Sequence, residues 1–256
     1  KIMEQDLVTH GQMDFNLPHD VVPLPSGGIF YKSKKKNVKV GYLTASDENI
    51  LVNIDGTKTI KESIIIPLLR NKLYEREIRP EELLEGDVEA ILLFLRNTSF
   101  GPEYNIIVTD PKTSKRFETS IMLDELNIVK PVFQPDENGL FSVTLPVSNT
   151  QVKLKLLSLT DTMEIDNIVN LYPTGYNAPI VTTRLSKMIV ELNGSTDGNQ
   201  ISTFVQTMPI RDSKFIRSFM KENEPKLDLK KTVIAPSGEK VDVEINFGVE
   251  FFRPFF

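Results

Sequence analysis

The spacing of apolar residues changes twice along this chain, and that change restricts the possible folds more than any other feature of the sequence. From Val88 to Asn97 apolar residues recur every three to four positions, which predicts a buried helix. From Tyr104 to about Leu159 they alternate with polar residues, as in half-buried strands. From Thr160 onward the helical spacing returns. We therefore expect an α+β fold, with an N-terminal strand/helix region, central β-hairpins and a C-terminal helical bundle closed by a β-hairpin.

The length of 256 residues allows one large domain or two small ones. We expect four sections along the chain: an extended N-terminal arm at 1–20, an N-terminal α/β region at 21–103, a β-hairpin section at 104–159, and a helical bundle with closing β-hairpin and aromatic tail at 160–256. The first section is polar and lacks a clear period, so we expect a partner to order it.

Capping residues and acidic residues in the first turn indicate where the expected helices begin and end. Asp47 and Glu48 put negative charge into the first turn of one helix, and Asn193–Gly194 is a typical C-terminal stop of another. The expected helical segments are Thr44–Ile54, Lys61–Leu69, a short turn at Pro80–Leu84, Val88–Asn97, Thr160–Leu171, Ile180–Leu192, Gln200–Met208 and Asp212–Glu224.

Alternation and turn residues predict three hairpins. Their strands are Ile106–Val108 with Phe117–Ile121, Phe133 with Phe141–Leu145, and Thr232–Ile234 with Lys240–Ile245. The first and third hairpins share a proline-containing knuckle, at Pro111 and at Pro236. Ordinary turn chemistry explains this likeness, and the alternative is a related pair that packs together. We predict that the closing hairpin packs against Tyr104–Met122, with the two proline turns close together.

Few residues of this chain could carry catalysis. It has no cysteine, which excludes disulfides, thiol nucleophiles and Cys-ligated metals. Its two histidines, His10 and His19, both fall in the expected arm, with no sequence motif for a nucleophile beside them. Acidic pairs such as Glu81–Glu82 fit helix first turns and solvated loops better than paired catalytic acids. We therefore expect no enzyme, no catalytic residue, no cofactor and no metal, while a carboxylate-dependent hydrolase remains an alternative.

The charge balance argues against a general affinity for nucleic acid. The formal net charge is −5, so binding to phosphate backbones would need a local basic patch. Lys34–Lys36, with Lys32 and Lys39, is the best such cluster, and it also fits a solvated loop. A nucleic-acid-binding accessory protein is accordingly a second alternative. No stretch approaches the ~20 apolar residues of a membrane helix, so we expect no membrane contact and a soluble protein made in a cytoplasm.

The last six residues contain four phenylalanines, Phe251, Phe252, Phe255 and Phe256. Four such side chains in water would promote association, so they either fold back onto the core or anchor in a partner. We expect contacts with partner proteins at the aromatic and histidine side chains near the two ends of the chain: Phe251, Phe252, Phe255, Phe256, His10, His19, Phe30 and Tyr31.

Several motifs in fixed order resemble a known family. Leu24-Pro25-Ser26-Gly27-Gly28-Ile29-Phe30-Tyr31 is similar to the LPS-x-G-x-FY opening of the T-even-type (T4-like) bacteriophage baseplate proteins, the family around the baseplate hub assembly component. Further matching pieces are Leu43–Glu48 with Leu51, Leu83–Leu84 with Gly86–Asp87, Leu95–Gly101 with Tyr104, Pro111–Leu126, Pro209–Ser213 and Phe251–Pro254. The resemblance covers the chain from about residue 21 to its end.

The resemblance implies a non-catalytic structural component of the baseplate hub in a contractile tail. It implies other baseplate and hub or tail proteins as partners, several copies per particle, and a place in the virion after assembly in the host cytoplasm. A hub assembly chaperone absent from the mature virion is the close alternative. Some relatives resemble this chain but carry Cys-x-x-Cys knuckles at Asp110–Thr113 and Ala235–Gly238. Here packing between the hairpins would have to replace any metal.

Overall fold

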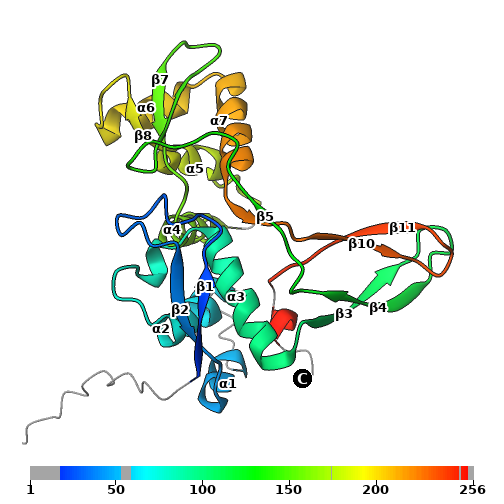
Figure 1. Ribbon diagram of the computed structural model, residues 1–256. Coiled ribbons are helices and arrows are strands. Elements are labelled where there is room, and N and C mark those ends of the chain that lie inside the picture. The colour runs from blue at the N-terminus through cyan, green and yellow to red at the C-terminus, as the bar shows by residue number, and fades with distance from the viewer. Residues whose placement is uncertain (1–17, 53–58, 174, 248, 253–256) are drawn as a thin grey trace, which may run out of the picture.

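The fold is α+β, as predicted, and consists of a lower lobe, an upper lobe and a long arm (Figure 1). The computed structural model describes residues 18–52, 59–173, 175–247 and 249–252. Most of the expected N-terminal arm, with His10, lies outside the described residues, as do Phe255 and Phe256. The last two residues of the expected N-terminal arm, His19 and Asp20, form the start of strand β1 (His19–Pro23).

The lower lobe comes from the N-terminal part of the chain. Its elements are β1 (His19–Pro23), β2 (Asn37–Gly41), α1 (Ala45–Val52), the π-helical turn η1 (Lys61–Ile65), α2 (Ile66–Lys72), the 3-10 turn η2 (Pro80–Glu82) and α3 (Glu85–Phe100). The two strands pair antiparallel. The predicted helices are confirmed in place, and α3 extends beyond the predicted range at both ends. It ends at Gly101, whose φ of 79° ends the helical conformation.

The loop between β1 and β2 needs glycine at position 28. Gly28 has a φ of 73°, and a Cβ built on it would lie 2.1 Å from the Lys35 carbonyl oxygen. Only a residue without a side chain fits that close backbone approach. Glycine at this position therefore lets the two sides of the β1–β2 loop pack directly against each other.

The arm consists of two antiparallel hairpins that run side by side (Figure 1). They are β3 (Glu103–Thr109) with β4 (Arg116–Met122), and β10 (Lys230–Ile234) with β11 (Lys240–Glu244). Both were predicted from alternation and turn residues, and both are confirmed.

The upper lobe is a three-stranded antiparallel sheet with helices packed on it. Its elements are β6 (Phe141–Thr144), β7 (Gln151–Leu154), α5 (Ile180–Met188), β8 (Ile189–Leu192), α6 (Gly198–Thr207) and α7 (Ile210–Asn223). The strand order is β6-β7-β8. Two predictions are wrong here. The strand Phe141–Thr144 pairs with β7 instead of with Phe133. The helix expected to reach Leu192 ends at Met188, because its last residues pair with β7 as a strand.

Short elements connect the lobes and the arm. They are β5 (Ile128–Val129), α4 (Leu159–Asn170), β9 (Lys226–Leu227) and the 3-10 turn η3 (Val249–Phe252). The chain enters α4 through a capping box, in which the Ser158 hydroxyl accepts from the Asp161 backbone and the Asp161 carboxylate accepts from Ser158. β5 pairs antiparallel with β9, which brings the middle and the end of the chain together.

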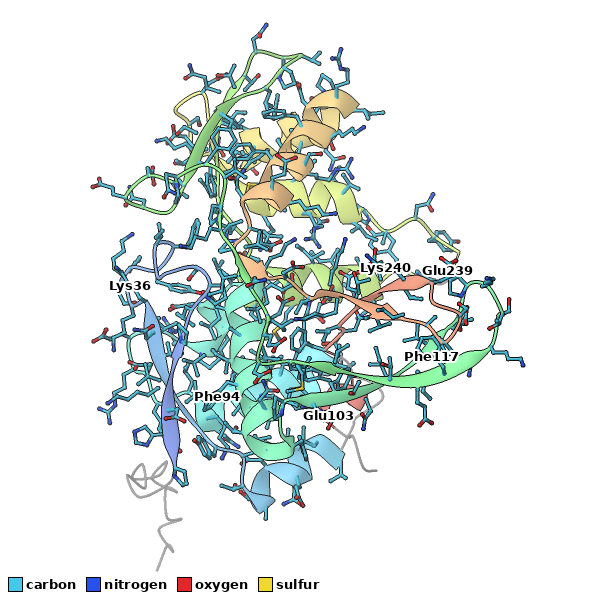
Figure 2. The ribbon with its side chains drawn as sticks, turned by 45° about the vertical axis from the view of Figure 1, so that its right-hand side comes forward. Lys36, Phe94, Glu103, Phe117, Glu239 and Lys240 are labelled. Atoms are coloured by element: carbon cyan, nitrogen blue, oxygen red, sulfur yellow. The ribbon has the colours of Figure 1, made fainter. Side chains whose placement is uncertain are left out.

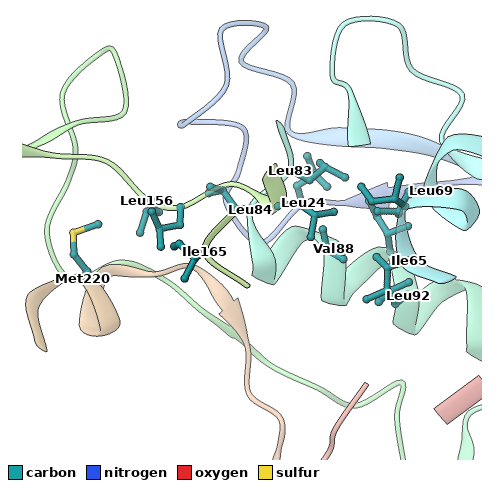
Figure 3. Packing of buried hydrophobic residues seen from close by; sticks show 14 of the residues in the cluster. Leu24, Ile65, Leu69, Leu83, Leu84, Val88, Leu92, Leu156, Ile165 and Met220 are labelled. Atoms are coloured by element: carbon teal, nitrogen blue, oxygen red, sulfur yellow. The ribbon is translucent and has the colours of Figure 1, made fainter. Parts of the chain in front are cut away.

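One apolar core runs through both lobes (Figure 3). Leu83 and Leu92 belong to the part of the core that lies in the lower lobe, next to α2 and the β1–β2 loop. Leu156, Ile165 and Met220 continue it toward the upper lobe. Continuous burial of this kind links the lobes into one body that carries the arm.

Candidate functional site

The Leu24–Tyr31 segment is fixed to the lower lobe by one buried carboxylate, that of Asp87 at the start of α3. Its Oδ1 accepts the Ser26 backbone N–H at 2.9 Å, and its Oδ2 accepts the Tyr31 hydroxyl. The Tyr31 oxygen in turn accepts the Leu84 N–H at 3.0 Å. Tyr31 is buried, and its hydroxyl belongs to this internal hydrogen-bond network.

Burial controls the protonation of this pair. It raises the pKa of Asp87, while the hydrogen bonds from Ser26 and Tyr31 lower it by a smaller amount. Burial, then the charge of Asp87 and the hydrogen bond to it, raise the pKa of Tyr31. Tyr31 therefore stays protonated and continues to donate.

The first two phenylalanines of the tail fold back onto the base of the arm. Phe251 and Phe252 are 0% and 2% exposed. The Phe251 ring lies 4.6 Å from that of Phe247 and 5.7 Å from that of Tyr104, measured between centroids. Of the two alternatives for the tail, folding back is the one that these two residues adopt.

The same aromatic group encloses a buried arginine. The Arg96 guanidinium carbon lies 5.1 Å from the Tyr104 centroid and 5.7 Å from that of Phe251. Its two terminal nitrogens donate to the carbonyls of Gly101 and, at 2.9 Å, Glu103. Burial lowers the pKa of Arg96. Backbone carbonyls and ring faces thus stabilise a buried cation where the arm leaves α3.

The two hairpins of the arm are linked by Asp110, at the end of β3. Its carboxylate accepts two hydrogen bonds from Ser237, next to Pro236, and so holds the two proline turns together. This confirms the predicted packing of the closing hairpin against the first one. Figure 2 shows Phe117 on one hairpin and Glu239 and Lys240 on the other in the outer part of the same arm.

The arm presents apolar side chains to solvent. Ile107 on β3 and Ile234 on β10 are 67% and 70% exposed. Exposed apolar side chains on a projecting pair of ribbons are typical of surfaces that contact other proteins.

A family model described as T4 bacteriophage base plate protein matches residues 29–253. The chain belongs to this family. The match confirms the resemblance to T4-like phage baseplate proteins that the motifs carry. No curated protein and no solved structure gives a significant match. Membership of the T4 bacteriophage base plate protein family implies a place in the tail baseplate and contacts with other baseplate proteins.

Among the described residues, two of the predicted contact residues, His19 and Phe30, reach the surface. His19 is exposed on β1, with its ring edge-on to Tyr74 at 5.9 Å. Phe30 is half-buried, lies 5.9 Å from the Phe141 ring, and lines a hollow of about 690 Å³ between the lobes. The structure does not bring His19 and Phe30 together with Phe251 and Phe252 into one site.

Two lysines of the Lys34–Lys36 cluster make contacts within the chain. Lys34 Nζ donates to the Ile29 carbonyl at 2.8 Å and to that of Glu137. Lys35 forms an ion pair with Glu75. These contacts fix the loop to its surroundings and give the nucleic-acid alternative no particular support.

A hollow of about 220 Å³ between α3 and β9 is lined by several carboxylates that no sequence motif marks. Burial first, and then the charges of Glu85 and Glu224, raise the pKa of Glu89 to about 7. Burial and Glu85 likewise raise the pKa of Glu224. Lys226 faces both and partly offsets the shifts. Pairing of β9 with β5 creates this site, so no local signal in the sequence could have found it.

No helix in the described ranges is long and apolar enough to cross a membrane. In the same ranges, no group of three or more His, Asp or Glu side chains is arranged to hold a metal ion.

Proposed function

We propose that this protein is a structural subunit of the hub region in the baseplate of a contractile phage tail, and that it acts through protein–protein contacts without catalysis. The observation that carries the proposal is the family match across residues 29–253. The exposed arm supports it, since Ile107 and Ile234 are placed where a neighbouring subunit could cover them.

The partners in this proposal are other baseplate and hub or tail proteins, with several copies of the chain per particle. His19 and Phe30 are contact residues on the described surface, and His10, Phe255 and Phe256 are proposed as further ones. Tyr31, Phe251 and Phe252 are buried, and their proposed part in these contacts is indirect: they hold the Leu24–Tyr31 segment and η3 in place. The protein is proposed to assemble in the host cytoplasm and to remain in the virion.

Quantitative mass spectrometry of purified tails and of assembly intermediates tests this function. We expect the protein in mature particles, at a copy number that fits the symmetry of the tail. Presence in intermediates with absence from mature tails would make it an assembly chaperone. Absence from both would overturn the structural role altogether.

A further inference from the structure

Strand β6 leaves one edge of the upper sheet unpaired. Leu145, which follows β6, donates its backbone N–H to the Thr150 carbonyl at 2.9 Å. In an antiparallel pair every second residue of a strand makes its backbone hydrogen bonds to the partner strand, so in β6 the residue that bonds to β7 next to Leu145 is Val143. The N–H and C=O groups of Ser142 and Thr144 therefore point away from β7. In the described part of the chain, no hydrogen bond reaches them.

An aromatic groove runs beside this edge. Its volume is about 600 Å³, and its lining comes from β6, from one face of α7 and from the segment before β6: Phe133, Gln134, Phe141, Ser142, Val143, Thr144, Phe215, Ser218, Phe219 and Glu222. The Phe219 ring lies 5.4 Å from Phe133 and 5.6 Å from Phe141. Phe133 is 54% exposed, so the groove is open to solvent.

The edge and the groove together fit one kind of occupant. Unpaired donors and acceptors on every second residue match an extended backbone, whose groups repeat at the same spacing of two residues. Neither a helix nor a small molecule offers that repeat. The residues of β6, Phe-Ser-Val-Thr, include no lysine or proline of the kind that protects an edge strand from pairing.

We propose that an extended segment of a neighbouring polypeptide adds to β6 as a fourth strand of the upper sheet. One aromatic or large aliphatic side chain of that segment packs against Phe215 and Phe219. Glu222 is the one charged side chain among the described residues that line the groove, and it favours a basic residue at that end of the segment. The neighbour is another baseplate subunit, and this last point rests on the proposed function.

Hydrogen exchange of the wild-type protein, isolated and within purified baseplates, tests the added strand. In the isolated protein we expect fast exchange at the Ser142 and Thr144 amides and slow exchange at Val143. In the baseplate we expect the first two to slow by at least about tenfold, as for amides that gain a hydrogen bond. Equally fast exchange of both amides in the two states would overturn the proposal.

Matched variants test the same edge in phage that lack the gene and receive it in trans. The double variant Ser142→Pro with Thr144→Pro removes the two outward N–H groups, which β7 does not use. Its control, Ser142→Ala with Thr144→Ala, shortens the same side chains and keeps both groups. We expect incorporation of the proline variant into tails to fall about tenfold, as for a loss of about 1.4 kcal/mol, and the alanine variant to match wild type.

The groove is tested with Phe215→Ser against Phe215→Leu, which keeps an apolar side chain. We expect the serine variant to be incorporated poorly and the leucine variant nearly normally. Normal incorporation of both the proline and the serine variants would contradict the proposal. Thermal unfolding of each purified variant shows whether it folds, and where the proline variant does not, the exchange of the wild-type protein decides.

The two proposals fail in different ways. If the protein is absent from tails and intermediates, both the function and the strand addition are wrong. If the protein is incorporated but the Ser142 and Thr144 amides stay unprotected, only the strand addition is wrong.

Discussion

Asp110 and Ser237 lie 127 positions apart in the sequence, yet the Ser237 hydroxyl donates to Asp110 Oδ1 at 2.8 Å and its backbone N–H donates to Oδ2 at 3.2 Å. Oδ1 also accepts the backbone N–H groups of Lys112 at 2.9 Å and Thr113 at 3.3 Å. One carboxylate thus closes its own turn and cross-links the two hairpins. The ionised form of the carboxylate, which accepts at both oxygens, suits all four of these hydrogen bonds.

Acid should therefore loosen the arm. Burial works to raise the pKa of Asp110, but the hydrogen bonds from Ser237, Lys112 and Thr113 outweigh it and hold the pKa below its ordinary value. A lowered pKa gives stabilisation that is present above the unfolded pKa, about 4, and is lost as the pH falls through the folded one. We expect amide exchange in both hairpins to quicken at that acid end. Asp110→Asn should show loose hairpins already at neutral pH, whereas the exposed Asp124→Asn should behave as wild type.

Removing the Tyr31 hydroxyl should destabilise the lower lobe. Tyr31→Phe leaves Asp87 Oδ2 and the Leu84 N–H without their partner in a buried place. Losses of this kind cost about 1–3 kcal/mol. Chemical denaturation of the purified variant measures the loss.

Tyr42→Phe is the matched control for that change. The Tyr42 hydroxyl donates to Asp20 at 2.6 Å on the exposed side of the sheet. We expect this variant to stay within about 0.5 kcal/mol of wild type, as surface substitutions do. Equal losses in both variants would contradict a special role for the buried pair.

The contact between α3 and β9 leaves no room for a side chain at Gly86. A Cβ built there would lie 2.1 Å from the Pro225 carbonyl oxygen and 2.7 Å from Lys226 Cα. Although alanine favours a helix over glycine, Gly86→Ala should lower the thermal midpoint because the backbone has to move. Gly198→Ala, in the first turn of α6 with no atom within 4 Å of the added Cβ, should leave the midpoint unchanged or raise it. A stable Gly86→Ala protein would show that β9 can shift freely.

Local patterns in the sequence predicted those elements whose partners are close in the chain. The β3–β4 hairpin followed from alternation on both sides of a proline turn, and α3 followed from one continuous apolar face. The strand β8 was missed because Ile189–Leu192 continues the apolar spacing of α5, and only pairing with β7 makes it a strand. Pairing with β7 therefore outweighed the helical preference of the local sequence at Ile189–Leu192.

The candidate contact surface was predictable only in part. The sequence predicted that the phenylalanines near the C-terminal end need to be covered. It could not show whether residues of the same chain, such as Arg96 and Tyr104, or a partner protein would cover Phe251. The groove beside β6 was missed because Phe133 was assigned to a hairpin, and because its rings come from three separate segments. Such a surface exists only after Phe141 and Phe219 have been brought together by folding.

Glu89 should make the stability of the protein fall as the pH rises. The folded pKa of about 7 is above the ordinary value of 4.5, mainly because of burial and then because of Glu85 and Glu224. A raised pKa of an acid gives stabilisation that is complete below the unfolded pKa and is lost as the pH rises through the folded one. The loss should therefore develop between about pH 4.5 and pH 7 and persist above it.

Glu89→Gln removes this ionisation and tests it directly. We expect the variant to exceed wild type in free energy of unfolding by up to about 3 kcal/mol at pH 8, with the difference vanishing near pH 4. Glu118→Gln, on the exposed face of β4, is the control and should follow wild type at every pH. Urea denaturation of both proteins from about pH 4 to about pH 8 measures this difference. If the free energies of unfolding of wild type and Glu89→Gln changed in parallel with pH, water would already reach the Glu89 carboxylate between α3 and β9, and the prediction would be wrong.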